Sequence, residues 1–353
     1  MIARLARPRL ALVGAYPPPL GGCSVHVQRL RRSLDDSWSV TVVDLYGRDD
    51  AAEQNVVRCG RRTPFNLLRA MTALRAARPT IAHFHVSALR AFAFAGWPLL
   101  AALPSASRSV LTIHGGAFAG DIERAAPWRR RITRALLQRF DAIIAVSEPQ
   151  RRALLGLGVR PARITVVPAF VPPVAHIAEE STAVQALRGR TEMVVVCSGY
   201  AERHYGFHDV IAAIELLRER GRSVGLVLCW YNSYDADYVA SLEEELRALP
   251  HLIFRDLPPD RFAEVLASGT CYVRATDRDG DAVAIREASY FDRPVVASDA
   301  APRPPGCLVY PYGDVKALAQ AIETVLSDPA AGRLPASEDG IAAIRDVYEQ
   351  VSR

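Results

Sequence analysis

The chain has 353 residues, half of them hydrophobic, which is long enough for two domains that each bury a core. Its apolar runs stay below the length of about 18 residues that a membrane-spanning helix needs, and the apolar residues 10–15 are too few for a signal peptide. We therefore expect a cytoplasmic protein. Residues 1–170 carry 25 arginines against 10 acidic residues, whereas residues 171–353 carry 18 basic against 28 acidic residues.

The basic first half indicates an anionic partner. Nucleic acid, an acidic membrane surface and a lipid diphosphate all meet that requirement, and composition alone does not choose among them. Nucleic acid is the least favoured, because the arginines are spread over many predicted elements and no known nucleic-acid-binding motif organises them.

The six cysteines are scattered and include no Cys-x-x-Cys pair, so we expect reduced, buried thiols. No histidine or cysteine cluster has the sequence spacing of a structural zinc site. We therefore expect neither a metal nor a cofactor.

Short apolar strands alternate with helical patterns along the first half, which predicts a parallel, doubly wound α/β sheet. The expected strands are residues 9–14, 39–45, 81–84, 109–113, 142–146 and 164–167. The expected helices are residues 24–34, 65–77, 88–103, 122–140 and 149–157. Loops 17–22 and 114–120 then follow strands, at the edge where open α/β sheets bind ligands.

The alternation breaks near residues 169–173 and resumes at residue 193, which predicts a second sheet of the same kind. Its expected strands are residues 193–197, 223–230, 252–254, 271–274, 294–297 and 307–309. Its expected helices are residues 206–218, 235–249, 261–267, 282–290, 314–326 and 340–351. We place an N-terminal domain at 1–172, a C-terminal domain at 173–335 and a last helix within 336–353.

Two carboxylates eight positions apart, Asp279 and Glu287, flank the junction between a loop and the helix predicted at 282–290. Gly280 lets backbone amides approach a ligand, and the helix directs the positive end of its dipole toward that ligand. The buried strand 294–297 follows. An ordinary exposed helix with acidic residues is the competing interpretation.

This pattern resembles the signature of retaining glycosyltransferases of family four, in which two glutamates separated by seven residues precede a strand like Pro-Val-Val-Ala-Ser-Asp. Asp279 stands where the family has its first glutamate. The resemblance implies a GT-B fold, with two Rossmann-like doubly wound domains facing a cleft and a last helix that crosses back to the first domain. It also implies that Glu287 holds the ribose of a nucleotide sugar, while the sugar and phosphate contact Asp279 and the amides of Gly280, Asp281, Ala282 and Val283.

The loop after the first strand contains Gly21 and Gly22 and precedes a helix that Ser24 could cap. Paired glycines at the start of a helix let the backbone approach an anion. The family carries a similar Gly-Gly loop close to the donor diphosphate and the acceptor, which implies the same role here. A turn without a ligand is the alternative.

His114 follows the strand 109–113 and precedes two glycines, so its imidazole is expected at the ligand-binding edge. The family has a histidine in a similar Thr-x-His setting that contacts the transferred sugar. A histidine satisfied by local backbone is the alternative. His83 and His85 resemble a pair in the family, and we expect them to act in packing and positioning.

The segment 126–140 places Trp128, Ile132, Leu136 and Phe140 at four-residue spacing, with arginines over much of the remaining surface. Such a helix can lie on anionic lipid. An ordinary core-facing helix with a charged exterior is the alternative.

The chain departs from the family pattern in the loop after residue 197. Relatives have an arginine beside the glycine matching Gly199 and a lysine before the next glycine, and these cations neutralise the departing diphosphate. Tyr200 and Tyr205 occupy both places here. Arg203 and His204 are the expected replacements, and the further candidates are Arg274, Arg278 and Arg286.

The sequence therefore predicts a metal-independent, retaining glycosyltransferase that uses a nucleotide-diphosphate sugar. Its basic first half suits a saccharide acceptor on a lipid diphosphate, at the inner face of the membrane, in bacterial surface polysaccharide assembly. The alternatives are a GT-B sugar-nucleotide epimerase, a non-catalytic GT-B subunit and, less favoured, a nucleic-acid binder.

Overall fold

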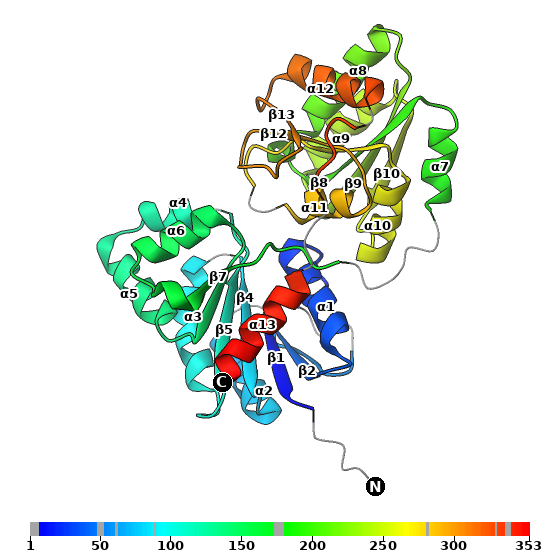
Figure 1. Ribbon diagram of the computed structural model, residues 1–353. Helices are drawn as coiled ribbons and strands as arrows, with labels where there is room; N and C mark the ends of the chain where they lie inside the picture. Colours follow the sequence, from blue (N-terminus) through cyan, green and yellow to red (C-terminus); the bar gives the residue numbers. More distant parts are fainter. Residues whose placement is uncertain are drawn as a thin grey trace. The chain divides into compact units, whose positions relative to one another are not determined.

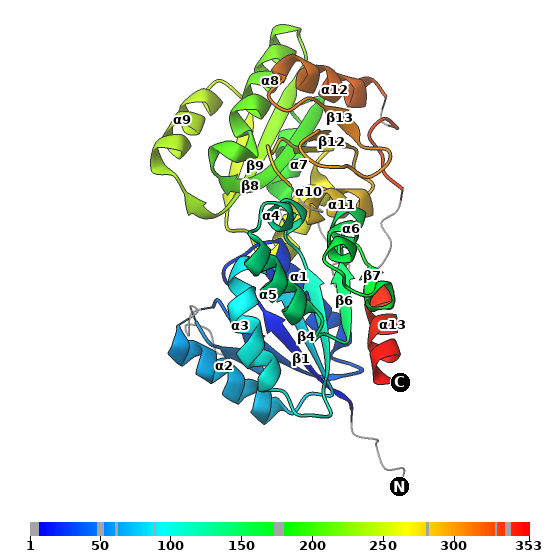
Figure 2. The ribbon, with the colours of Figure 1, turned by 90° about the vertical axis from the view of Figure 1, so that its left-hand side faces the viewer.

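The computed structural model describes residues 7–47, 53–60, 63–87, 89–116, 118–172, 180–279, 282–328, 330–335 and 340–353. The chain divides into two compact units (Figures 1 and 2). The first unit comprises Met1–Val174 and Asp339–Arg353, and the second comprises Ala175–Glu338. Helix α13 (Gly340–Ser352), at the end of the chain, therefore belongs to the first unit.

The first unit contains a parallel sheet in the order β3-β2-β1-β4-β5-β6-β7. Its strands are β1 (Arg9–Gly14), β2 (Ser39–Asp44), β3 (Val56–Arg58), β4 (Ile81–Val86), β5 (Arg108–Ile113), β6 (Ala142–Ala145) and β7 (Ile164–Val166). Its other helices are α1 (Gly22–Leu34), α2 (Pro64–Ala77), α3 (Leu89–Ala101), α4 (Phe118–Glu123), α5 (Pro127–Leu137) and α6 (Glu148–Gly156).

Alternate strand residues bury their side chains on opposite faces of this sheet. Along β1, Leu10 and Leu12 pack in the core that α1 and α13 cover, whereas Ala11 and Val13 pack in the core formed with α2 to α6. Both faces are thus covered, which explains why strands such as β1 and β6 bury apolar side chains on both faces rather than alternating.

The order of the strands reverses at β1, which pairs with β2 on one side and β4 on the other. Open α/β sheets bind ligands at the carboxyl ends of strands at such a reversal. Gly14 ends β1 there, and a Cβ atom on it would lie 2.8 Å from the carbonyl oxygen of His85. Only glycine permits this close approach of β1 to β4.

The second unit repeats the design with a parallel sheet in the order β10-β9-β8-β11-β12-β13. Its strands are β8 (Met193–Ala201), β9 (Val224–Tyr234), β10 (His251–Arg255), β11 (Cys271–Arg274), β12 (Val295–Ser298) and β13 (Leu308–Tyr310). Its helices are α7 (Thr182–Arg188), α8 (Phe207–Glu219), α9 (Ala236–Leu246), α10 (Pro259–Ser268), α11 (Val283–Tyr290) and α12 (Val315–Ser327).

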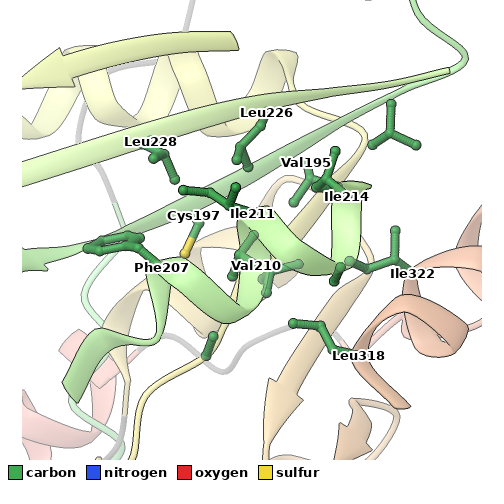
Figure 3. Packing of buried hydrophobic residues seen from close by; sticks show 14 of the residues in the cluster. Val195, Cys197, Phe207, Val210, Ile211, Ile214, Leu226, Leu228, Leu318 and Ile322 are labelled. Atoms are coloured by element: carbon green, nitrogen blue, oxygen red, sulfur yellow. The ribbon is translucent and has the colours of Figure 1, made fainter. Parts of the chain in front are cut away.

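Helices α8, α9 and α12 cover one face of this sheet, and α7, α10 and α11 cover the other. Figure 3 shows α8 packed between the sheet and α12, with Ile211 toward the strands and Val210 near Leu318. The strand order reverses at β8, which pairs with β9 and β11. The expected ligand-binding edge therefore lies at the carboxyl ends of β8 and β11.

The predicted elements are confirmed with a few corrections. The single helix expected at 122–140 is wrong: α4 and α5 are separate, and Pro127, which lacks an amide hydrogen, begins α5. Strand β3 and helix α7 were not expected. The expected cap is also wrong, because Gly21 is the N-cap of α1 and the Ser24 hydroxyl donates to the carbonyls of Pro19 and Gly21.

The six cysteines all lie in the described part of the chain and form no disulfide there; Cys23 and Cys307 are partly exposed, and the other four are buried. Within the described residues, every helix is too short or too polar to cross a membrane.

Candidate functional site

Four histidines gather near the carboxyl end of the first unit's sheet, on the face covered by α1 and α13. They are His26 of α1, His83 and His85 of β4, and His114, which follows β5. His85 Nδ1 lies 3.1 Å from His114 Nε2, and the His26 and His114 ring centroids are 4.7 Å apart. The structure thus places His114 inside a cluster of imidazoles rather than in isolation at a loop.

His26 is held by a backbone carbonyl. Its Nδ1 lies 2.8 Å from the carbonyl oxygen of Ala169, which can only accept, so Nδ1 carries the hydrogen in the neutral ring. The other nitrogen, Nε2, is buried and finds no hydrogen-bond partner within the part of the chain that the structure describes. His26 therefore presents a bare acceptor lone pair to the cluster.

His83 has both ring nitrogens hydrogen-bonded. Nδ1 lies 2.7 Å from the hydroxyl of Tyr348 in α13, and Nε2 lies 2.7 Å from the hydroxyl of Thr112 in β5. This fully partnered, buried ring joins α13 to the sheet, as expected for a packing role.

Burial lowers the pKa of all four rings, because a charged imidazolium loses its hydration inside the protein. The pKa of His26 falls to about 4, and those of His83, His85 and His114 fall well below the ordinary value, with neighbouring histidines adding to the shift. At neutral pH the rings are uncharged. They can exchange hydrogen bonds with a sugar hydroxyl, but they do not supply a cation.

Three of the rings could also hold a metal ion. His26, His85 and His114 each offer one nitrogen, and these atoms all lie within 4.8 Å of one another. Neutral imidazoles suit zinc and other transition metals. The sequence spacing concealed this set because its members come from three separate elements.

The Gly-Gly loop lies at the start of α1. Gly21 is the N-cap with extended backbone, Gly22 is exposed, and none of the described side chains caps the first amides of the helix. Those amide hydrogens remain available to an anion.

In the second unit, two arginines enclose Asp279. Arg274, the last residue of β11, donates from Nε to Asp279 Oδ2 at 2.9 Å and from Nη2 to Oδ1 at 3.2 Å. Arg303, in the loop after β12, donates from Nη1 to Oδ2 at 2.9 Å. The exposed fractions of these side chains are 13% for Arg274, 8% for Asp279 and 2% for Arg303.

Backbone carbonyls hold both arginines at the ends of the strands. Arg274 Nη1 donates to the carbonyl of Ser198 in β8, while Arg303 Nε donates to the carbonyl of Ser298 in β12. Burial alone would raise the pKa of Asp279, but the two guanidinium groups outweigh it and keep that pKa below its ordinary value. The cluster therefore carries two positive charges and one negative charge.

Tyr205 lies against this cluster. The Arg274 guanidinium is 5.1 Å from the centre of the Tyr205 ring, and the Tyr200 ring packs edge-on against Tyr205. A Cβ atom on Gly199 would lie 2.0 Å from the Tyr205 ring. Gly199 therefore accommodates an aromatic ring where relatives are expected to have a lysine.

Arg203 and His204, the expected phosphate cations, line a cavity of about 650 Å³ together with Glu202, Asp235, Asp277, Arg278 and Tyr312. Arg203 lies over the Tyr238 ring at 5.3 Å, and His204 Nδ1 lies 3.2 Å from a Glu202 carboxylate oxygen. The exposed Arg278 pairs with Asp277. The cavity is thus lined by three carboxylates against two arginines.

Glu287 lies in α11 and is only 4% exposed. It is close to Tyr231 of β9, whose pKa is raised chiefly by burial, with the charges of Cys229 and Glu287 adding to the shift. Ala282 is the N-cap of α11, where the described residues provide no side-chain cap, and Val283 begins the helix. The predicted ligands Gly280 and Asp281 lie outside the described residues.

Two residues of these clusters were not expected. Arg303 is 24 positions beyond Asp279 in an irregular loop, so sequence spacing gave no signal for the pair. His26 could have been noticed, because it lies one helical turn beyond Gly22 and therefore near the end of α1 that faces the ligand-binding edge.

Two parallel sheets, each covered by helices on both faces and each with a polar cluster at its strand reversal, define the chain's architecture as the GT-B fold. The model named Glycosyltransferase Family 4 matches residues 20–174, and the model named Glycosyl transferases group 1 matches residues 192–328. The chain belongs to glycosyltransferase family four, which confirms the resemblance seen in the sequence.

Solved structures of the same fold align over nearly the whole chain. Sucrose-phosphate synthase from Thermosynechococcus elongatus has a TM-score of 0.70 and 18% identity, covering 98% of this chain and 96% of that one. Anabaena HepE in complex with UDP and glucose has a TM-score of 0.70 and 16% identity, covering 98% of both chains. A putative UDP-N-acetylglucosamine 2-epimerase from Listeria monocytogenes has a TM-score of 0.64 and 16% identity, covering 97% and 95%. A search of curated protein sequences found no significant match.

Proposed function

We propose that this protein transfers a sugar from a nucleotide-diphosphate donor to a saccharide acceptor with retention of anomeric configuration. The observation that carries the proposal is the cluster of Arg274, Asp279 and Arg303 at the strand reversal of the second unit, beside the start of α11, which no side chain of the described residues caps. Excess positive charge and free helix amides suit a diphosphate. HepE, of the same fold, has been solved with UDP-glucose.

In this proposal Glu287 holds the ribose, while Asp279 and the amides of Ala282 and Val283 contact the sugar and phosphate. His114 contacts the sugar as a neutral hydrogen-bonding group. The bond between the anomeric carbon and the diphosphate breaks, a bond to the acceptor oxygen forms on the same face, and the acceptor proton passes to a phosphate oxygen. This route needs no protein nucleophile, and arginines rather than a metal ion stabilise the leaving group.

A donor panel tests the proposal. We expect one or more of UDP-, GDP- and ADP-sugars to raise the melting temperature of the wild type by mass action, and Glu287→Ala to lose that increase. The matched control is Glu264→Ala, which removes a carboxylate of α10 that pairs with Arg261. We also expect turnover in the presence of EDTA and a product that keeps the anomeric configuration of the donor sugar. No stabilisation by any donor would contradict the proposal.

We further propose a lipid-linked acceptor at an anionic membrane surface, in bacterial surface polysaccharide assembly. The support is α5, where Trp128 is 51% exposed and Arg129, Arg130 and Arg131 are all exposed. Aromatic rings and arginines on one helix suit the headgroup region of anionic lipid.

Vesicle flotation tests this surface. We expect binding to vesicles with anionic lipid but not to neutral ones. The triple variant Arg129→Gln, Arg130→Gln, Arg131→Gln should bind about 100-fold more weakly, since each basic residue near the surface contributes about 1 kcal/mol. The control removes the exposed Arg75, Arg78 and Arg160 instead. Equal loss in both variants would show that net charge, not α5, governs binding.

One observation favours a second candidate. Tyr200 and Tyr205 occupy the expected places of the phosphate cations, which is compatible with a non-catalytic GT-B subunit. A subunit of that kind would leave the donor intact with every acceptor. An epimerase, the description given to the Listeria relative, would instead release an isomerised nucleotide sugar without any acceptor.

A further inference from the structure

We propose that Arg274 is the residue that binds the donor diphosphate, with Arg303 as its positioning residue and with Asp279 orienting its guanidinium group in addition to contacting the sugar. This inference rests on the proposed function, because it names the cation that replaces the pair lost at Tyr200 and Tyr205. It also removes that role from Arg203 and His204, which the sequence favoured.

The charges around the two candidate sites have opposite signs. Counted over the described residues, Arg274 and Arg303 against one carboxylate leave the buried cluster with an excess positive charge. The cavity of Arg203 has the reverse balance, since Glu202, Asp235 and Asp277 outnumber its two arginines. A diphosphate is attracted to the first site and repelled by the second.

Arg303 creates this excess. Without it, Arg274 and Asp279 would form a neutral pair with no net attraction for an anion. With it, the carboxylate is shared between two guanidinium groups, so part of the positive charge of Arg274 remains uncompensated. Since Arg303 is only 2% exposed and Arg274 is 13% exposed, Arg274 is the one that reaches a ligand.

The orientation of Arg274 is fixed before any ligand arrives. Asp279 accepts from two of its nitrogens, the backbone carbonyl of Ser198 accepts from the third, and the guanidinium carbon lies 5.1 Å from the centre of the Tyr205 ring. Each terminal nitrogen carries two hydrogens and donates only one of them in these bonds. The remaining hydrogens can form charge-assisted bonds to phosphate oxygens with little loss of side-chain entropy.

A second feature of the same edge points to an anion. Helix α11 begins at Val283, four residues beyond Asp279, and among the described residues no side chain caps its first amides. The positive end of its dipole and the uncompensated charge of Arg274 therefore occur at the same end of β11. Together they provide the electrostatic stabilisation that the family otherwise obtains from the loop after β8.

The test compares nucleoside diphosphates with nucleosides by calorimetry, using UDP with uridine, GDP with guanosine and ADP with adenosine. For the pair that wild type prefers, we expect Arg274→Gln to weaken diphosphate binding about tenfold or more while nucleoside binding stays unchanged. Arg303→Gln should act in the same direction, and Arg303→Lys should restore part of the affinity. A general loss of structure would weaken the binding of both the diphosphate and its nucleoside, so the ratio of the two affinities isolates phosphate recognition.

Arg203→Gln and Arg278→Gln are the matched controls and should change diphosphate affinity less than twofold. If Arg274→Gln does not fold, Arg274→Lys keeps the charge but loses the two-pronged geometry, and it should still lower the diphosphate-to-nucleoside ratio severalfold. An unchanged ratio in the Arg274 variants, or a loss in Arg203→Gln instead, overturns this inference while the proposed function stands. Wild type that binds no diphosphate overturns the proposed function itself.

Discussion

Replacing Asp279 with alanine is expected to destabilise the second unit by about 3–5 kcal/mol, which is the usual cost of removing one partner from a buried ion pair. Both Arg274 and Arg303 would lose their counter-charge, and both side chains are almost fully buried. Neither group can respond by losing its proton, since arginine stays charged in proteins. The two uncompensated guanidinium groups would also repel each other.

Asp277→Ala is the matched control. Asp277 pairs with Arg278, whose side chain is 76% exposed, so its removal should cost at most about 1 kcal/mol. Hydrogen exchange read by mass spectrometry is the suitable measurement, because a chain of two units does not have one unfolding free energy. The double variant Asp279→Ala, Arg303→Met should recover part of the loss. If the amides of the second unit are as well protected from exchange in Asp279→Ala as in the wild type, the carboxylate does not compensate the charges of the arginines.

The fold could be predicted from the sequence because local hydrophobic patterns determine its helices and strands. Apolar segments such as 9–14 and 271–274 alternate with amphipathic helices, and the observed strands Arg9–Gly14 and Cys271–Arg274 have those bounds. The errors arose where local chemistry is ambiguous. Pro127 breaks a helical pattern that otherwise continues, and the three-residue strand β3 is too short to show a period.

The candidate site could be predicted only in part, because its contacts join distant residues. Asp279 and Glu287 stand out through their spacing near one helix. The partner Arg303 comes from the loop after another strand, and the pairing depends on β11 and β12 being neighbours in the sheet. Likewise His26 and His114 come together through the packing of α1 against the strands.

Acidification is expected to destabilise the first unit by several kcal/mol between pH 6.5 and 5. His26, His83 and His85 are buried and His114 is partly buried, all as neutral rings, with the pKa of His26 lowered to about 4 and those of the other three lowered well below the ordinary value. In the unfolded chain each ring has a pKa of about 6.5 and takes up a proton below that pH. The unfolded state then binds more protons than the folded state, so the free energy of unfolding falls as the pH falls.

The loss should be roughly 1 kcal/mol for each histidine over the first pH unit below 6.5, or about 4 kcal/mol for the four rings together. Hydrogen exchange at pH 7.0, 6.0 and 5.0, corrected for intrinsic rates, separates the units. His85→Phe removes one titrating ring and should flatten the pH dependence of the first unit by about a quarter. His251→Phe in the second unit should leave it unchanged. The positive charge of Arg29 also disfavours protonation of His26 in the folded protein. Equal protection of the first unit's amides from exchange at pH 7 and pH 5 would mean that the four rings are not held as neutral groups.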